Sequence, residues 1–386
     1  MTAPAYDFSP SAVLLLLGAT LALLPLLWVG WRHRQASSAQ RWRALALITL
    51  FLTFDLVLVG AFTRLTDSGL GCPDWPGCYG NASPLGAHHE INAAQSAMPT
   101  GPVTHGKAWI EMLHRYLATG VGALITVLAI AAWMQSRRQR LTVSPWWATA
   151  TWIWVCLQGA FGALTVTMKL YPAIVTAQLL GALGLLGLLA VQSQLSVDRR
   201  LGLSPALYRG AMVVLAVCVL QIALGGWVST NYAVLACQEF PTCQGEWWPT
   251  MDFARGFTLV RELGMGPDGE YLPFSALTAI HVVHRLGAAV VLVAVGGLGW
   301  RLWVSGDAEQ RRWAQAMGVV LLWQLITGLS NVVLDWPLVA AVGHTGGAAA
   351  LVVVLTMMIT RARRSDTTSG APAATPTTPR VARAAS

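Results

Sequence analysis

The chain has 386 residues, of which 55% are hydrophobic and only 11% are charged. This composition excludes an ordinary soluble domain and is typical of a polytopic membrane protein. The net charge of +8 does not indicate nucleic-acid binding, because the arginines cluster in short loops between long apolar segments.

Nine segments are apolar and long enough to be transmembrane helices, since a helix needs about 20 apolar residues to cross a bilayer. The first has no basic residues before it and no small-residue cleavage site, so we interpret it as a retained span rather than a signal peptide. The expected fold class is therefore an all-α polytopic membrane protein, with two pseudo-repeated four-helix bundles plus one extra N-terminal transmembrane helix. The expected spans are 11–31, 44–63, 109–134, 146–168, 171–195, 207–229, 275–303, 313–335 and 338–361.

The arginine-rich loops fall on one side of this nine-span arrangement, and the positive-inside rule makes that side cytoplasmic. The long loops 64–108 and 230–274 then face outward, as does the N-terminus. The end of the chain is rich in Ala, Thr, Pro and Ser, which predicts a disordered cytoplasmic tail. We divide the chain into an N-terminal helix with a basic loop, an N-terminal half, a C-terminal half and this tail: residues 1–43, 44–195, 196–361 and 362–386.

The two halves contain the same series of glycine, cysteine and polar residues. In each copy, twelve residues separate the glycine from the first cysteine, six separate the two cysteines, and twenty separate the last two members. So many matched spacings indicate a duplicated helical unit. The first copy contains Gly60, Cys72, Cys78, Glu111, His114, Arg115, Gln158 and Gln178, and the second contains Gly225, Cys237, Cys243, His281, His284, Arg285, Gln324 and His344.

Four of the six cysteines form two close pairs in the outward loops, Cys72 with Cys78 and Cys237 with Cys243. An oxidising outer compartment favours disulfides there. A metal site is the alternative, but no Cys-x-x-Cys spacing supports zinc. The pattern does not decide whether such bridges are structural or redox-active.

Three histidines and one glutamine lie at matched depths inside the predicted spans. At about 1.5 Å of rise per residue, His114, Gln178, His284 and His344 all lie roughly 10 Å below the outer face. Each copy therefore brings two side chains to one level, which suits a haem iron held by axial ligands in a helical bundle. A lone intramembrane histidine also serves as an interhelical hydrogen-bonding residue, but matched positions in two repeats favour haem ligation.

Glu111 precedes His114 by three residues, so both project from one helix face. A carboxylate near a lipid-buried site is costly unless it has a function or a partner. Glu111 is either a proton donor or radical-stabilising group beside a reacting haem, or the partner of a basic residue such as Arg115. The second copy has His281 at this position. This divergence suggests one reactive site and one electron-transfer site.

Other polar residues have less distinctive positions. Arg115 and Arg285 directly follow their histidines and either bind haem propionates or extend to the membrane interface. Asp55 lies in the middle of a span and is interpreted as an interhelical contact without a catalytic role. The His-His-Glu run 88–90 has copper-binding residue types, although a solvated loop is the simpler interpretation.

The run 63–78, Thr-Arg-Leu-Thr-Asp-Ser-Gly-Leu-Gly-Cys-Pro-Asp-Trp-Pro-Gly-Cys, resembles the signature of the haem A synthase family. Residues 111–115 match the family's Glu-x-x-His-Arg motif, and residues 281–285 and 343–344 match its second half. The resemblance covers roughly residues 42–361, which is nearly all of the predicted membrane core.

The resemblance implies an oxidoreductase that converts haem O to haem A, oxidising a ring methyl to a formyl group through successive hydroxylations. It implies that His284 and His344 hold a permanent haem b in the C-terminal half. It also implies that His114 belongs to the substrate haem site in the N-terminal half, with Glu111 needed for chemistry. The loop cysteines match pairs to which the family gives a redox or structural role.

The resemblance also implies a setting. The protein would be a multi-pass protein of the inner (plasma) membrane with a cytoplasmic C-terminus. Its partners would be haem O delivered by a haem O synthase, an electron donor or acceptor in the membrane, and cytochrome oxidase assembly factors, with no nucleic acid among them.

The sequence departs from the family pattern in two places. Gln178 stands where the family usually has a fourth histidine, and an amide is a poor iron ligand. The substrate haem would then be five-coordinate through His114 or bound with water, and an open iron position favours oxygen or peroxide chemistry. The second departure is the extra span 11–31.

Three other functions explain part of the pattern. A two-haem b-type electron carrier needs two complete histidine pairs, so Gln178 and Glu111 count against it. A quinone-linked thiol oxidoreductase would use the outer cysteines but leaves the deep histidines unexplained. A non-catalytic haem chaperone for oxidase assembly has no sequence feature that separates it from the enzyme.

Overall fold

The computed structural model describes residues 8–138, 143–197, 201–266, 268–304 and 307–366. Within these ranges, nine helices are long and apolar enough to cross a membrane, which confirms the predicted all-α polytopic membrane fold. Three short helices of the described residues lie in the loops 64–108 and 230–274. The elements are α1 (Ser9–Arg32), α2 (Ser38–Leu65), α3 (His88–Ala97), α4 (His105–Arg137), α5 (Trp146–Thr167), α6 (Pro172–Leu195), α7 (Pro205–Thr230), the 3-10 helix η1 (Ala233–Ala236), α8 (Phe253–Gly256), α9 (Phe274–Val304), α10 (Ala308–Val333) and α11 (Leu338–Asp366).

Each predicted span corresponds to one long helix, but several helices begin earlier than hydropathy predicts. The α2 helix begins at Ser38 rather than at 44, because Ser37 and Gln40 form a reciprocal capping box. The α10 helix begins at Ala308 rather than at 313, because the Asp307 carboxylate caps it by accepting a hydrogen bond from the Glu309 amide at 2.7 Å. The polar first turn of each of these helices therefore lies outside the apolar segment that hydropathy detects.

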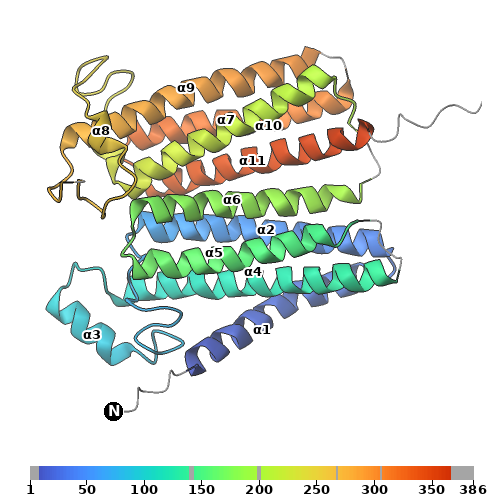
Figure 1. The fold of residues 1–386 in the computed structure, drawn as a ribbon, viewed down its shortest axis with the longest axis horizontal. Helices are drawn as coiled ribbons and strands as arrows, with labels where there is room; N and C mark the ends of the chain where they lie inside the picture. The colour runs from blue at the N-terminus through green and yellow to red at the C-terminus, as the bar shows by residue number, and fades with distance from the viewer. Residues whose placement is uncertain (1–7, 139–142, 198–200, 267, 305–306, 367–386) are drawn as a thin grey trace, which may run out of the picture.

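The four helices of each half pack in a closed ring. In the N-terminal half, α2 and α5 each contact both α4 and α6. In the C-terminal half, α7 and α10 each contact both α9 and α11, which is the same order of packing. The helices α2, α6, α7 and α11 join the two rings, whereas α1 lies outside them along α4 (Figure 1).

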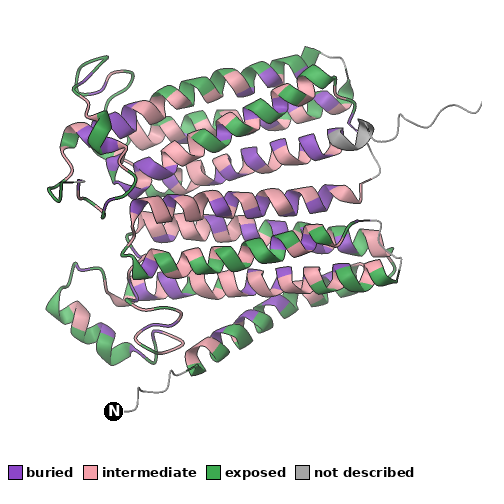
Figure 2. Cartoon of the chain, in the orientation of Figure 1, coloured by how far each residue is buried: buried purple, intermediate pink, exposed green. Residues whose placement is uncertain are grey.

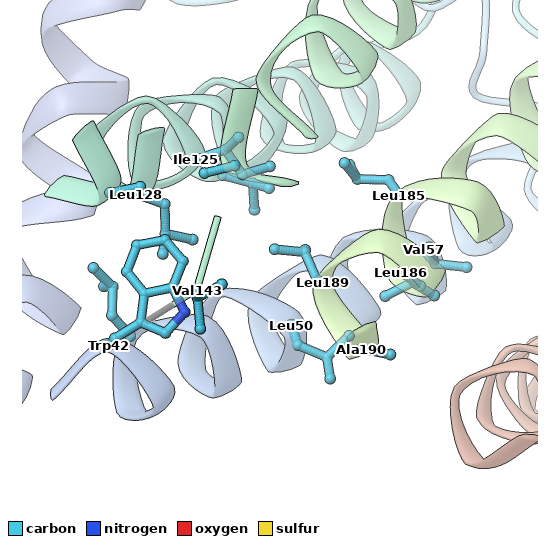
Figure 3. Close-up of a cluster of buried hydrophobic side chains, with 14 of the residues drawn as sticks. Trp42, Leu50, Val57, Ile125, Leu128, Val143, Leu185, Leu186, Leu189 and Ala190 are labelled. Atoms are coloured by element: carbon cyan, nitrogen blue, oxygen red, sulfur yellow. The ribbon is translucent and has the colours of Figure 1, made fainter. Parts of the chain in front are cut away.

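The packed interior lies between helices, and apolar side chains also cover the outside. Trp42, Ile125 and Leu189 belong to a buried cluster between α2, α4 and α6 (Figure 3). Leu302 and Met317 belong to a second buried cluster in the C-terminal half. The outward faces of α1, α5 and α10 expose many large apolar residues (Figure 2). A surface of this kind suits contact with lipid.

Both long loops lie at the same end of the helices, as the nine-span arrangement predicts. The loop helices α3 and α8 are at this end, and α11 ends at the other (Figure 1). The α11 helix continues to Asp366, so residues 362–366 of the expected tail are helical. The rest of that tail, 367–386, lies outside the described residues.

A polar cluster joins the two halves at the loop end. The Arg64 guanidinium donates to the Ser229 carbonyl oxygen at 2.6 Å and lies 4.2 Å from the ring centroid of Tyr232. The Tyr232 hydroxyl donates to the Asp67 carboxylate at 2.7 Å, and burial is the main cause of the raised pKa of this tyrosine. Because Arg64 lies in the last turn of α2 and Ser229 in the last turn of α7, the cluster links the two rings of helices at this end.

Candidate haem-binding site

The four side chains at matched depth all lie beside a glycine of a neighbouring helix. A Cβ atom built on Gly60 of α2 would lie 3.0 Å from Cε1 of His114, and one built on Gly225 of α7 would lie 3.0 Å from Cε1 of His284. A side chain larger than that of glycine at Gly60 or Gly225 would therefore crowd the neighbouring imidazole. The other two pairs are His344 beside Gly328, at 3.2 Å, and Gln178 beside Gly162, at 3.6 Å.

The two histidines of the C-terminal half have hydrogen-bond partners at Nδ1. His284 Nδ1 lies 2.9 Å from the amide nitrogen of Gln221, and His344 Nδ1 lies 3.0 Å from the hydroxyl of Thr327. The helices that carry them, α9 and α11, both pack against α7 and α10. This half therefore brings together both of its predicted iron ligands.

The N-terminal half presents a different pair. His114 Nδ1 is buried and has no hydrogen-bond partner among the described residues. Gln178 takes the position that His344 takes in the other half, beside the corresponding glycine. The asymmetry predicted from the sequence is thus present in the packing, with one imidazole in this half and two in the other.

Glu111 is buried, with only 4% of its surface exposed, and is fully paired. One carboxylate oxygen accepts from the backbone amide of Cys72 at 2.8 Å, and the other lies 2.5 Å from the Arg115 guanidinium. The loop reaches this position because Gly71 lies against α4, where a Cβ would be 2.4 Å from the backbone of Lys107. The salt bridge considered as an alternative is therefore present, and it connects the first disulfide loop to the helix that carries His114.

Arg115 and Arg285 hold the two disulfide loops in the same way. Arg115 donates to the Asp74 carbonyl oxygen at 2.9 Å and to the carbonyl oxygens of Pro76 and Gly77. Arg285 donates to the carbonyl oxygens of Thr242 and Cys237 at 3.0 and 2.8 Å. Each arginine therefore holds a loop above its histidine. This role differs from the two predicted from the sequence, which were binding of haem propionates and extension to the membrane interface.

The loops themselves are closed by disulfides and by a repeated acidic contact. Disulfide bonds join Cys72 to Cys78 and Cys237 to Cys243, as predicted from the position of both pairs in the long loops. The Asp74 carboxylate accepts from the amides of Tyr79 and Gly80 at 2.6 and 2.7 Å. In the second loop, Glu239 occupies the same position after its cysteine and accepts from the Gly245 amide at 3.2 Å.

Replacing Arg285 by alanine should loosen the second loop. A hydrogen bond to a charged group contributes about 1.5–3 kcal/mol, so amide protection should fall in residues 237–246 while the helices keep theirs. Hydrogen exchange followed by mass spectrometry would measure this. Arg301→Ala is the matched control, since Arg301 is exposed at the other end of the same helix. Equal protection of the loop in both variants would contradict the assigned role.

The structure also places the other polar residues singled out from the sequence. The rings of His88 and His105 lie 4.8 Å apart and both hydrogen-bond Asn92. Within the described ranges, no group of three or more metal-ligating side chains occurs. Asp55 is half-buried in α2.

Sequence reasoning missed Gln221 and Thr327, which contact the predicted iron ligands directly. Gln221 carried a usable signal, because an amide inside a predicted span is scarce and needs a partner. Thr327 carried none, since a threonine in a helix commonly bonds its own backbone, as this one also does to Trp323 at 2.8 Å.

Comparison with known proteins identifies the relatives of this chain. Residues 43–356 match the family described as "Cytochrome oxidase assembly protein". A "Heme A synthase" of Shewanella oneidensis is 39% identical over 311 residues, which cover 78% of this chain and 91% of the relative. Relatives of the same name from Halalkalibacterium halodurans and Mesorhizobium japonicum are 27% and 28% identical, over 78% and 82% of this chain and 91% and 88% of their own length. The chain therefore belongs to the haem A synthase family of cytochrome oxidase assembly proteins.

Proposed function

We propose that this protein is a membrane haem A synthase, an oxidoreductase that oxidises the ring methyl of haem O to a formyl group and supplies haem A to cytochrome oxidase. The observation that carries the proposal is the pair of matched intramembrane sites, one with two imidazoles and one with an imidazole beside a buried carboxylate. Family membership supports the same reaction, because several relatives are heme A synthases.

The residues of the C-terminal half fit a resident haem b. His284 and His344 belong to one ring of helices, and glycines of neighbouring helices leave room for both imidazoles. Thr327 engages Nδ1 of His344, which leaves Nε2 as the atom directed to iron. Haem b bound here would supply one-electron transfer.

The residues of the N-terminal half fit a substrate haem. His114 offers one imidazole, and Gln178 is too weak a ligand to complete a bis-imidazole site. Glu111 lies on the same helix face as His114, and Arg115 balances its charge. We infer that Glu111 holds or moves a proton near the methyl group that is oxidised, while Arg115 and the first disulfide loop keep its carboxylate in place.

The halves 44–195 and 196–361 would then be the substrate haem domain and the haem b domain. We place the arginine-rich loops and the C-terminus in the cytoplasm and both disulfide loops outside the plasma membrane. The proposed partners are haem O from a haem O synthase, a membrane electron donor or acceptor, and oxidase assembly factors.

The test is expression in a host that makes haem O but not haem A, followed by haem extraction and chromatography. We expect haem A, together with a hydroxylated intermediate when turnover is limited. Bound haem b with neither product would instead support the electron carrier or the chaperone. A control with all four loop cysteines replaced tests the thiol oxidoreductase, which predicts loss of activity with haem content unchanged.

A further inference from the structure

The two halves differ in what surrounds their imidazoles, beyond the exchange of one histidine for glutamine. Gln221 lies four residues before Gly225 on α7, and its amide nitrogen is 2.9 Å from His284 Nδ1. Thr327 lies one residue before Gly328 on α10, and its hydroxyl is 3.0 Å from His344 Nδ1. Both contacts come from the helix that also provides the glycine beside the ring.

The N-terminal half has apolar residues at both corresponding positions. Leu56 lies four residues before Gly60, and Phe161 lies one residue before Gly162. Neither side chain has a hydrogen-bonding atom, and His114 Nδ1 is accordingly buried without a partner in the described part of the chain. Among the described residues, Nδ1 of each predicted ligand imidazole thus has a side-chain partner in the C-terminal copy and none in the N-terminal copy.

We propose that Gln221 and Thr327 are positioning residues that make the C-terminal site retain its haem, while their absence lets the N-terminal site exchange substrate and product. This rests on the proposed function in one respect, that both halves bind haem. A second hydrogen bond to an iron-ligating imidazole fixes its tautomer and orientation and raises its strength as a ligand. A permanent cofactor needs that strength, whereas a product that must leave does not.

The geometry at His344 already suits iron. The Thr327 hydroxyl donates its proton to the Trp323 carbonyl oxygen at 2.8 Å, so its oxygen accepts from Nδ1–H of the ring. The ring proton is then on Nδ1, and the lone pair of Nε2 is free. His344 is thus set in the tautomer that ligates through Nε2.

The geometry at His284 requires one rearrangement. The Gln221 amide nitrogen donates both to Nδ1 and to the His284 carbonyl oxygen, at 2.9 Å each, which puts the ring proton on Nε2. The amide oxygen of Gln221 is buried and has no partner among the described residues. Ligation through Nε2 moves the ring proton to Nδ1. The amide then turns so that its oxygen accepts a hydrogen bond from Nδ1–H, and its bond to the His284 carbonyl oxygen is given up.

The experiment uses the full-length protein, purified in detergent from a host without haem O. Gln221→Leu and Thr327→Val remove one partner each, and Leu56→Gln is the reciprocal control that gives His114 a partner. Transfer of haem b to apomyoglobin measures retention, redox titration gives the midpoint potential, and circular dichroism checks that each variant is folded. We expect transfer from Gln221→Leu and Thr327→Val to be about 10- to 100-fold faster than from wild type, with an altered midpoint potential. Unchanged transfer rates and potentials in both variants would overturn the proposal.

Two further variants separate positioning from packing. Gln221→Glu offers only acceptor oxygens, so we expect haem b to be retained with a lower midpoint potential, because a stronger acceptor at Nδ1 makes the imidazole a stronger donor to iron. Loss of haem from this variant would show that the amide nitrogen is the required partner and would overturn the proposed turn. In a host that makes haem O, Leu56→Gln should slow release of haem from the N-terminal half, and unchanged release would count against the proposal.

These outcomes separate the inference from the proposed reaction. A wild-type protein that retains haem b but makes no haem A would contradict the synthase and leave the role of Gln221 and Thr327 measurable. A wild-type protein that binds no haem would overturn both.

Discussion

Replacing Glu111 by alanine is expected to abolish haem A formation while haem b stays bound in the C-terminal half. The carboxylate lies one helical turn from His114 and is the one acidic group buried beside a deep histidine in the described residues. A positioned proton-transfer group contributes about 100- to 10,000-fold to a rate, so product should fall by about 100-fold or more. Haem extraction and chromatography from cells that make haem O would measure the product, and the haem b absorption spectrum would report the other half.

Because Glu111 forms an ion pair with Arg115, the main alternative explanation for loss of product in Glu111→Ala is a structural effect. Glu111→Gln keeps an oxygen that can accept from the Cys72 amide but cannot exchange a proton. We expect this variant to hold the first disulfide loop and still lose the product. His281→Leu is the matched control, because His281 occupies the corresponding position in the other half. Full activity of Glu111→Gln would show that Glu111 has only a structural role, which is to hold the loop.

The membrane core could be predicted from the sequence because the bilayer itself sets the length of an apolar helix. The errors were at the ends, where Ser37 and Asp307 cap helices that begin in polar sequence. The packing of the helices into two rings followed from the repeat, since matched spacings on both copies require matched neighbours. The contact between the rings did not follow, because Arg64 and Tyr232 belong to positions that differ between the copies.

In the candidate site, too, some residues could be predicted from the sequence and some contacts could not. His114, His284 and His344 stood out because ionisable groups in spans are scarce, and depth could be counted from the span ends. Arg115 and Arg285 have partners that the sequence did not indicate, because these partners are backbone carbonyl oxygens of the loops, and a sequence does not show where a carbonyl points. Contacts of this kind depend on how a loop folds back over its helix.

Exchanging the residues at the fourth ligand position should exchange the coordination number of the iron between the two sites. Gln178→His places a second imidazole beside Gly162, where the Gln178 amide is now 3.6 Å from a built Cβ. The substrate haem should become six-coordinate and low-spin. The reciprocal variant, His344→Gln, leaves His284 as the only imidazole of its pair, and we expect its haem b to become five-coordinate and to be lost during purification.

Resonance Raman and electron paramagnetic resonance spectra of the purified proteins would distinguish these states, because bis-imidazole iron and five-coordinate iron differ in spin.

Comparing the two variants also separates the effect of the ligand itself from the effect of the hydrogen bond to its Nδ1. Gln178→His provides an imidazole but has Phe161 where the other half has Thr327, so its new ligand lacks a partner at Nδ1. The N-terminal site should therefore become low-spin yet still release haem faster than the C-terminal site. A six-coordinate bis-imidazole iron in the N-terminal half of the unaltered protein would contradict the open position assigned to Gln178. Equal retention by both sites in the Gln178→His variant would instead show that the number of imidazoles alone decides which haem stays.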